Sequence, residues 1–253
     1  MLPITTQLKI IIASVLLING YANAATSVWV YNQTRDIIVL NQNANAVRPV
    51  ASITKLMTAI VALDHDPVLS RSVKLSNRVG SNLPPGQYTR RQLLDAILIR
   101  SDNAAAETLA QDYSGGRLAF VRAMNLRAAE LGMKNTRFHD PTGLSMFNIS
   151  TPYEISIMLK TANQYAMVRS ISTQLKIKLV ANKRSVQYLN TNHDILSKFE
   201  SIVVSKTGFT NFAGFCIAVV VNKHNQEFVI VILGEKNKRE RAIAVGKIIQ
   251  LIN

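Results

Sequence analysis

Ser52 and Lys55 are the side chains of this chain best suited to chemistry, because a hydroxyl and an amine lie three positions apart. They begin a segment, residues 49–63, whose other side chains are mostly apolar and predict a buried helix. A spacing of three places both groups on one helical face. Burial disfavours the charged form of an amine, so a neutral Lys55 can accept the proton of Ser52.

Taken alone, the pair has an ordinary explanation, with Ser52 as a helix cap and Lys55 as a surface side chain. Two further polar motifs change this interpretation. Ser101-Asp102-Asn103 lies at a predicted break between two helices, and Lys206-Thr207-Gly208 ends a predicted strand. Each motif alone also has an ordinary explanation. The first could be a helix cap, with Ser101 or Asn103 as the capping residue. The second could be a strand that ends in a glycine turn.

The three motifs together carry more weight than each alone. S-x-x-K, S-D-N and K-T-G occur once each and in this order, and they are the signature of penicillin-binding proteins and class A β-lactamases. Residues 51–55, 138–145, 190–193 and 205–211 extend the match. On these residues the chain resembles the low-molecular-mass penicillin-binding proteins, the serine D,D-peptidases of family S11, over essentially the whole mature chain. The details favour the D-alanyl-D-alanine endopeptidase type.

The resemblance implies acyl transfer at a D-Ala amide of peptidoglycan through an acyl-enzyme on Ser52. Lys55 would be the general base, a role that is disputed across the wider superfamily. Ser101 would sit beside Lys55 and relay a proton to the leaving amine. Asn103 would hold the substrate backbone or orient Lys55. Lys206 would bind a substrate carboxylate or bias the protonation of Lys55.

The other substrate contacts that the resemblance implies follow Lys206 in the chain. Thr207 would hydrogen-bond the same carboxylate, and Gly208 would leave room for a peptide along the strand edge. The backbone N–H groups of Ser52 and Phe209 would form the oxyanion hole. No metal and no other cofactor is expected, since the four histidines show no ligand spacing.

The formal net charge of +14 is spread along the chain, without a long basic run. This pattern argues against a nucleic-acid partner and suits either polyanionic surroundings or simple solubility. The expected partners are peptidoglycan peptides and, as covalent inhibitors, β-lactam antibiotics. At most peripheral contact with a membrane is expected.

The N-terminus has the layout of a secretory signal peptide. Lys9 precedes the apolar residues 10–18, and Ala22-Asn23-Ala24 follows as a small-x-small cleavage signal. The apolar run is too short to span a bilayer. We therefore predict cleavage after Ala24, a periplasmic location, and one D,D-peptidase catalytic domain over residues 25–253, with an uncleaved anchor as the alternative. Cys216, the only cysteine, lies in an apolar run and predicts a buried thiol.

Strands are predicted at both ends of the chain and helices between them. The strands cover residues 27–31, 37–40, 201–207, 214–222 and 227–233, with a further short strand at 73–75. The helices begin near 52, 89, 104, 117 and 151, with capping boxes at Thr89 and Thr151, and a last helix covers 239–252 with Ile243, Ile248, Ile249 and Ile252 available to pack. The predicted fold class is α+β, an α/β sandwich of the β-lactamase/transpeptidase type. An antiparallel five-stranded sheet from both chain ends is packed with helices, and a helical middle region lies beside it.

Three other functions stay open. A class A β-lactamase needs an additional glutamate that activates water, and the candidates Glu130 and Glu154 have helix-surface or capping explanations. A D,D-carboxypeptidase shares the same catalytic motifs. A non-catalytic wall-binding or nucleic-acid-binding module would leave Ser52 inert. The basic residues 175–200 are either a solvated hairpin or part of a substrate groove.

Overall fold

The structure is a computed structural model, which describes residues 26–75, 81, 83–181 and 184–252. The predicted signal peptide and its cleavage site lie outside these residues. Within them, no helix has the length and apolar character that crossing a membrane would require.

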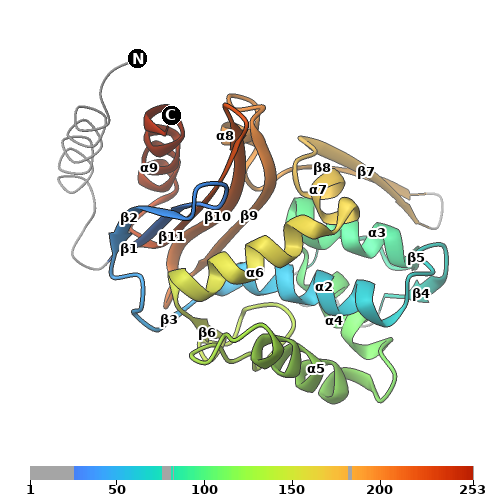
Figure 1. Cartoon of the computed structure of the whole chain (residues 1–253). Helices are drawn as coiled ribbons and strands as arrows, with labels where there is room; N and C mark the ends of the chain where they lie inside the picture. The colour runs from blue at the N-terminus through green and yellow to red at the C-terminus, as the bar shows by residue number, and fades with distance from the viewer. Residues whose placement is uncertain (1–25, 76–80, 82, 182–183, 253) are drawn as a thin grey trace, which may run out of the picture.

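One antiparallel sheet joins the two ends of the chain (Figure 1). Its strand order is β2-β1-β11-β10-β9, and β1 pairs with β11 from Ser27 opposite Leu233 to Asn32 opposite Phe228. The strands are β1 (Ser27–Asn32), β2 (Ile37–Gln42), β9 (Ile202–Thr210), β10 (Gly214–Lys223) and β11 (Gln226–Glu235). The predicted five-stranded sheet from both chain ends is therefore confirmed.

The central strands are apolar on both faces because helices cover both faces. Successive side chains of a strand point to opposite sides. Ile217 and Val219 of β10 therefore pack in the cluster that contains Val245 of α9 (Lys238–Leu251). The intervening Ala218 and Val220 join the larger core on the other side. In Figure 1, α9 lies on one face of the sheet and α6 (Pro152–Gln164) on the other.

The helical middle region lies beside the sheet and supplies most of the larger core. Its helices are α2 (Lys55–His65), α3 (Arg90–Asp95), the π-helical turn η2 (Ala96–Arg100), α4 (Asn103–Gln111), α5 (Gly116–Glu130), α6 and α7 (Ala166–Ser172). The short helix α8 (His193–Leu196) lies outside this region, because its Ile195 and Leu196 pack in the cluster that contains Val245 of α9. Short two-stranded pairings connect the helices of the middle region: β3 (Arg48–Pro49) with β6 (Ile149–Ser150), and β4 (Ser72–Lys74) with β5 (Gln87–Thr89).

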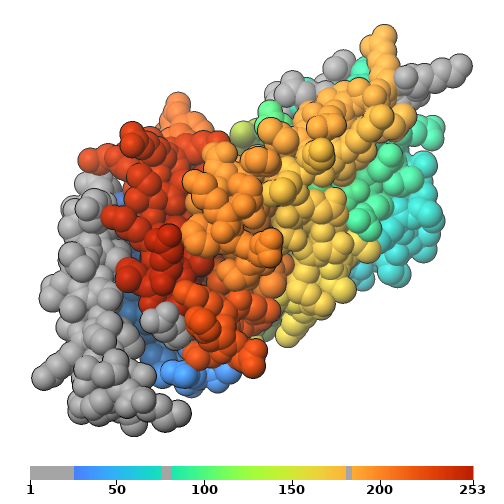
Figure 2. All heavy atoms as spheres, turned by 90° about the horizontal axis from the view of Figure 1, so that it is seen from above, coloured from blue at the N-terminus to red at the C-terminus, as the bar shows by residue number. Residues whose placement is uncertain are grey.

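The basic stretch that the sequence leaves ambiguous contains a hairpin. Strand β7 (Lys176–Ala181) pairs antiparallel with β8 (Arg184–Leu189). Lys176, Lys178 and Arg184 on it are exposed. Seen from above, this hairpin extends from one end of an elongated molecule, while α9 lies toward the other end (Figure 2). The structure thus shows a hairpin for part of this stretch, with Lys176 and Lys178 exposed on one face and with Leu179 and Tyr188 buried in the larger core.

Of the two capping boxes that the sequence predicts at helix starts, the structure contains one. Thr89 forms a complete capping box with Gln92. Thr151 accepts a hydrogen bond from the Glu154 backbone N–H, but the Glu154 carboxylate does not complete a box there. It accepts hydrogen bonds from Asn135 and Thr136 instead, and it is buried. The predicted second capping box is wrong because tertiary partners outcompete the local backbone for this carboxylate.

One predicted core position of the last helix is also wrong. Ile243 is 43% exposed, whereas Ile248, Ile249 and Ile252 are buried with Val245. At about 100° per residue, positions 245, 248, 249 and 252 share one face of a helix, and position 243 lies far from it. The packing of α9 on the sheet selects that face.

Candidate active site

Ser52 lies in a short 3₁₀ turn, η1 (Ala51–Thr54), which leads directly into α2. The turn begins with Ala51 in the left-handed region, at a φ of 47°. The α-helix itself begins at Lys55, so Ser52 precedes the helix instead of lying on its first turn. The predicted pairing nevertheless holds, because the Lys55 Nζ to Ser52 Oγ distance is 3.0 Å.

Lys55 is fully buried and is held by three oxygen atoms. Its Nζ lies 3.0 Å from Ser52 Oγ, 2.8 Å from Asn103 Oδ1 and 2.6 Å from the Thr142 carbonyl oxygen. Burial lowers the pKa of Lys55 to about 7, although the negative charge of Asp140 raises it in part. A neutral amine can donate to Asn103 and Thr142 and accept the Ser52 proton with its lone pair.

The second motif is positioned by the break between η2 and α4. Ser101 adopts a left-handed conformation, with a φ of 64°. Asp102 is the N-cap, and its carboxylate accepts a hydrogen bond from the Ala105 N–H at 2.9 Å. The alternative that Ser101 or Asn103 caps this helix is therefore wrong. Because the Asp102 side chain caps the helix, the Asn103 side chain contacts Lys55 and the Ser101 side chain contacts Lys206.

Lys206 is the second buried amine of the site. Its Nζ donates to Ser101 Oγ at 2.9 Å and to the Thr207 carbonyl oxygen at 2.8 Å. Burial, followed by the charge of Lys55, holds the pKa of Lys206 well below its ordinary value. The sequence predicts Lys55 as the neighbour of Ser101, whereas the hydrogen bond in the structure comes from Lys206. The Thr207 hydroxyl donates to Thr191 at 2.7 Å.

Gly208 lies where β9 passes directly against the turn that carries Ser52. A Cβ atom on Gly208 would lie 3.0 Å from the Ser52 nitrogen and 3.1 Å from the Val50 carbonyl oxygen. This close approach places the two predicted oxyanion donors, the N–H groups of Ser52 and Phe209, on neighbouring backbone segments. The half-exposed Phe209 ring stacks on Phe215. Strand β9 is an edge of the sheet, which leaves one side for a peptide to pair with.

A loop that contributes a backbone acceptor to the site is a feature that sequence reasoning missed. Asp140 accepts hydrogen bonds from the N–H groups of Thr142 and Gly143, each at 2.6 Å, and of Ser145, at 2.7 Å. This fixes the Thr142 carbonyl that holds Lys55. Burial alone would raise the pKa of Asp140, but a hydrogen bond from the Thr142 hydroxyl, together with those from the three N–H groups, lowers it. The Asp-Pro-Thr-Gly sequence indicates a turn; nothing in it indicates which carbonyl faces the lysine.

The same loop packs against the turn of the nucleophile. Gly143 has a φ of 85°, and a Cβ atom there would lie 1.9 Å from the Ala51 carbonyl oxygen. Asn148 bridges the two segments, because its Nδ2 donates to Thr54 Oγ1 at 3.1 Å and to the Asp140 carbonyl at 2.9 Å. The backbone around Ser52 is therefore supported on one side by β9 and on the other by this loop.

The two glutamates considered for a β-lactamase have other contacts in the structure. Glu154 is bound by Asn135 and Thr136 as described above, which corrects its expected surface or capping position. Glu130 pairs with Arg127 and is 63% exposed at its side chain. Cys216 is buried as predicted, and burial raises the pKa of its thiol to about 11, so the thiol stays protonated at neutral pH.

The arrangement defines the class of the protein. Three segments that are distant in sequence come together in the site. They supply Ser52 with the buried amine of Lys55, the polar side chains of Ser101 and Asn103, and the second buried amine, Lys206, on an edge strand. This is the constellation of serine acyl-transfer enzymes of the penicillin-binding class.

Comparisons with known proteins agree with this class. The family model for D-alanyl-D-alanine carboxypeptidase, peptidase S11, matches residues 18–237. A D-alanyl-D-alanine endopeptidase of Pseudomonas aeruginosa is 39% identical over 226 residues, covering 83% of this chain and 71% of that protein. A D-alanyl-D-alanine endopeptidase of Escherichia coli is 34% identical over 223 residues, with the same coverage of 83% and 71%.

Solved structures show the same fold. The Streptomyces K15 DD-transpeptidase superposes with a TM-score of 0.84 at 24% identity, covering 91% of this chain and 97% of that one. Penicillin-binding protein D2 of Listeria monocytogenes, in its ampicillin-bound form, gives a TM-score of 0.80 at 24% identity, with coverage of 91% and 97%. The chain thus belongs to peptidase family S11, the D-alanyl-D-alanine carboxypeptidase family, and is a serine-type hydrolase.

Proposed function

We propose that this protein is a D-alanyl-D-alanine endopeptidase of the periplasm, which hydrolyses D-Ala cross-links of peptidoglycan through an acyl-enzyme on Ser52. Membership of the family and the endopeptidases among its relatives support this substrate. The predicted signal peptide supports the location. The observation that carries the proposal is the buried Lys55 amine, 3.0 Å from Ser52 Oγ and with a pKa of about 7.

In the first half-reaction, Ser52 Oγ attacks the carbonyl carbon of a D-Ala residue and transfers its proton to the neutral Lys55 amine. The N–H groups of Ser52 and Phe209 stabilise the negative charge that develops on the carbonyl oxygen. The C–N bond then breaks. Its amine leaves after taking up the proton that Lys55 accepted, with Ser101, whose hydroxyl is held by Lys206, as the proposed relay.

In the second half-reaction, water attacks the ester carbonyl and gives its proton to Lys55. The C–Oγ bond breaks, Lys55 returns its proton to Ser52 Oγ, and the new carboxylic acid loses its own proton to solvent as it leaves. The substrate backbone pairs with the edge of β9, where Gly208 leaves space, and Asn103 provides a side-chain amide to it. Lys206 and Thr207 hold the carboxylate of the leaving half.

A β-lactam antibiotic presents a carbonyl and a carboxylate to the same groups, so we expect it to acylate Ser52 and remain bound. A D,D-carboxypeptidase, which removes a terminal D-Ala, is the second candidate function. It is favoured by relatives that carry this activity in their names, such as one of Bacillus subtilis that is 30% identical over 240 residues.

The first experiment is intact-mass measurement of the mature protein after incubation with benzylpenicillin, with peptide mapping of the product. We expect one adduct on Ser52, and none in the Ser52→Ala variant. The matched control is Ser156→Ala, which removes a hydroxyl whose hydrogen bond is to the Tyr153 carbonyl within α6 and should leave labelling intact.

Digestion of purified muropeptides then separates the two peptidase functions. Release of monomers from cross-linked dimers supports the endopeptidase, whereas loss of only terminal D-Ala from pentapeptides supports the carboxypeptidase. Normal cleavage of dimers by the Ser52→Ala variant would refute the mechanism. Rapid hydrolysis of the drug without an adduct would identify a β-lactamase.

A further inference from the structure

The sequence motif at residues 190–193 has no part in the mechanism above, yet it places a second threonine against Thr207. Thr191 lies just before α8, and its hydroxyl oxygen is 2.7 Å from that of Thr207 on β9. Thr191 is partly exposed, so the contact lies at the boundary of the site instead of within the core. A second hydroxyl therefore lies beside the one that is proposed to bind the carboxylate of the leaving half.

The backbone around Thr191 is fixed by buried hydrogen bonds. Asn190 is 5% exposed, and its side-chain amide donates to two backbone carbonyl oxygens near the end of α7. Its Oδ1 accepts a hydrogen bond from the Asn192 N–H at 2.9 Å. Asn192 is 2% exposed and donates to Ser205 Oγ of β9 at 3.0 Å. The Thr191 N–H donates to the Ile99 carbonyl oxygen at 3.0 Å, so the position of Thr191 is determined from both sides.

The two hydroxyls have only one hydrogen each, which limits how they bind a carboxylate. A threonine hydroxyl has one O–H donor and two lone pairs, whereas an ionised carboxylate only accepts hydrogen bonds. Thr207, which donates to Thr191 in the structure, can donate to a carboxylate only by turning its hydrogen away from Thr191. The Thr191 hydroxyl must then supply the hydrogen of the contact, because otherwise lone pairs of two oxygens would face each other at 2.7 Å.

We propose that Thr191 is a positioning residue for the leaving half of the substrate, because it donates to Thr207 Oγ and thereby directs the Thr207 hydrogen to the substrate carboxylate. The inference rests on the proposed function in one respect, the binding of that carboxylate at Thr207. Hydrogen bonds in such a chain polarise one another, so the donor to the carboxylate is strengthened as well as oriented. Lys206 Nζ, which donates to the Thr207 carbonyl oxygen at 2.8 Å, supplies the positive charge there.

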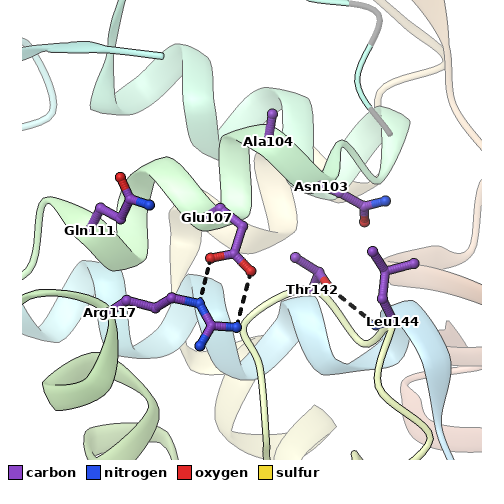
Figure 3. A pocket seen from close by; sticks show the side chains of 7 residues that line it. All are labelled: Asn103, Ala104, Glu107, Gln111, Arg117, Thr142 and Leu144. Carbon is purple, nitrogen blue, oxygen red and sulfur yellow. Dashed lines mark hydrogen bonds and ion pairs between the residues drawn. The ribbon is translucent and has the colours of Figure 1, made fainter. Parts of the chain in front are cut away.

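The contact is separate from the groups that hold the amine of Lys55. Asn103 and Thr142, which accept hydrogen bonds from that amine, line a pocket of about 400 Å³ that α4 and α5 also line (Figure 3). Neither Thr191 nor Thr207 is among the residues that line this pocket. Removal of the Thr191 hydroxyl should therefore change binding of the carboxylate without disturbing the hydrogen bonds of Lys55.

The test measures binding in the Ser52→Ala protein, where no turnover intervenes. One ligand is an acetylated tripeptide that ends in D-Ala-D-Ala with a free carboxylate, and the other is the same peptide with a C-terminal carboxamide. Titration calorimetry gives the ratio of their affinities. Addition of Thr191→Val, which keeps the shape and removes the hydroxyl, should lower the preference for the carboxylate about fivefold, the effect of one net hydrogen bond. Thr191→Ser, which restores a hydroxyl, should recover the preference.

A double-mutant cycle tests whether Thr191 acts through Thr207. In the Thr207→Val background, Thr191→Val should leave the ratio unchanged, because no Thr207 hydrogen remains to be directed. The control is Thr161→Val, which removes a hydroxyl bonded to the Ile157 carbonyl within α6 and should retain the ratio of the parent protein. Thermal unfolding verifies that each variant is folded. An unchanged ratio in Thr191→Val, an equal loss for both ligands, or an undiminished effect in the Thr207→Val background would overturn the inference.

Failure of the proposed function has a separate signature. Benzylpenicillin labelling of the unmutated protein tests acylation of Ser52, which the ratio of affinities does not involve. A protein whose ratio depends on Thr191 but which takes up no drug would retain the positioning residue and lose the acylation mechanism. A protein that takes up the drug and whose ratio is independent of Thr191 would retain the mechanism and lose the positioning residue.

Discussion

Lys55 combines two requirements that conflict in water, since it must be unprotonated near neutral pH and still be held in place. Complete burial meets the first requirement, and the oxygens of Asn103 and Thr142 meet the second. A lysine on the surface keeps its proton to a pH near 10. The environment of this residue therefore accounts for its proposed role as a base.

The protonation of Lys55 predicts how acylation depends on pH. With a pKa of about 7, the rate of benzylpenicillin acylation should rise with pH and reach half its maximum near pH 7, because only the neutral amine accepts the Ser52 proton. Stopped-flow or quenched mass measurement from pH 5 to 9 gives the profile. Lys55→Arg, which stays charged, should reduce the rate by at least about a thousandfold. A flat profile would contradict the assignment of Lys55 as base.

The same pKa predicts how stability depends on pH. The folded-state pKa of about 7 is below the ordinary lysine value of 10.5, so between these values the unfolded chain binds the additional proton. Stability therefore rises with pH through this window, by up to about 1.4 kcal/mol per pH unit for one group. Lys206 acts in the same direction, since its pKa is also lowered.

Urea unfolding between pH 7 and 9 measures this effect. We expect the midpoint to increase with pH in the wild type and to increase less in Lys55→Met, which has no group to titrate. Lys178→Met, on an exposed strand, serves as the control and should leave the slope unchanged. Identical slopes for the wild type and Lys55→Met would show that Lys55 is not buried as a neutral amine.

At the level of elements, the turn that carries Ser52 is held between β9 and the loop after Asp140. Neither contact is local in sequence, and each depends on a glycine at the point of closest approach. A rigid support of this kind matters because catalytic geometry tolerates only small displacements.

Substitution of two glycines with similar backbone conformations distinguishes the effect of this contact from the effect of backbone strain. Gly143→Ala and Gly132→Ala both place a side chain at positive φ, 85° and 76°, but only the first meets another segment, at 1.9 Å. Gly132→Ala should lower the free energy of unfolding by about 1 kcal/mol. Gly143→Ala should lower it by more than about 3 kcal/mol and slow benzylpenicillin acylation. Chemical unfolding and acylation rates check both, and equal effects would show that the loop does not constrain the turn.

At the level of the whole molecule, the sheet couples the two ends of the chain to the helical region. Strand β1 pairs with β11, and Trp29 of β1 packs edge to face on Tyr153 of α6. The larger core contains residues from both the sheet and the helices. The described residues should therefore unfold as one cooperative unit.

The single tryptophan allows a direct test of this cooperativity. Fluorescence of Trp29 reports on the sheet, and far-ultraviolet circular dichroism reports mainly on the helices. Their urea midpoints should coincide, and so should the loss of benzylpenicillin labelling. Distinct midpoints would divide residues 25–253 into separately folding parts, contrary to the prediction of one domain.

The sequence alone determined most of the secondary structure and the identity of the catalytic motifs. Alternating and continuous apolar runs predicted the five strands, and Thr89 with Gln92 predicted a helix start that the structure confirms. These features are local, because they depend on side-chain periodicity and on hydrogen bonds between near neighbours. The three motifs were identifiable because each combines residue types at fixed short spacings.

Tertiary structure alone decided the hydrogen-bond partners of the buried polar and ionisable groups. Glu154 left its predicted capping box for Asn135 and Thr136, Ser101 received its hydrogen bond from Lys206, and a backbone carbonyl at Thr142 became a ligand of Lys55. The physical reason is the same in each case. A buried polar group binds whichever partner the packing brings within reach, and that choice depends on segments tens of residues away, which local sequence does not encode.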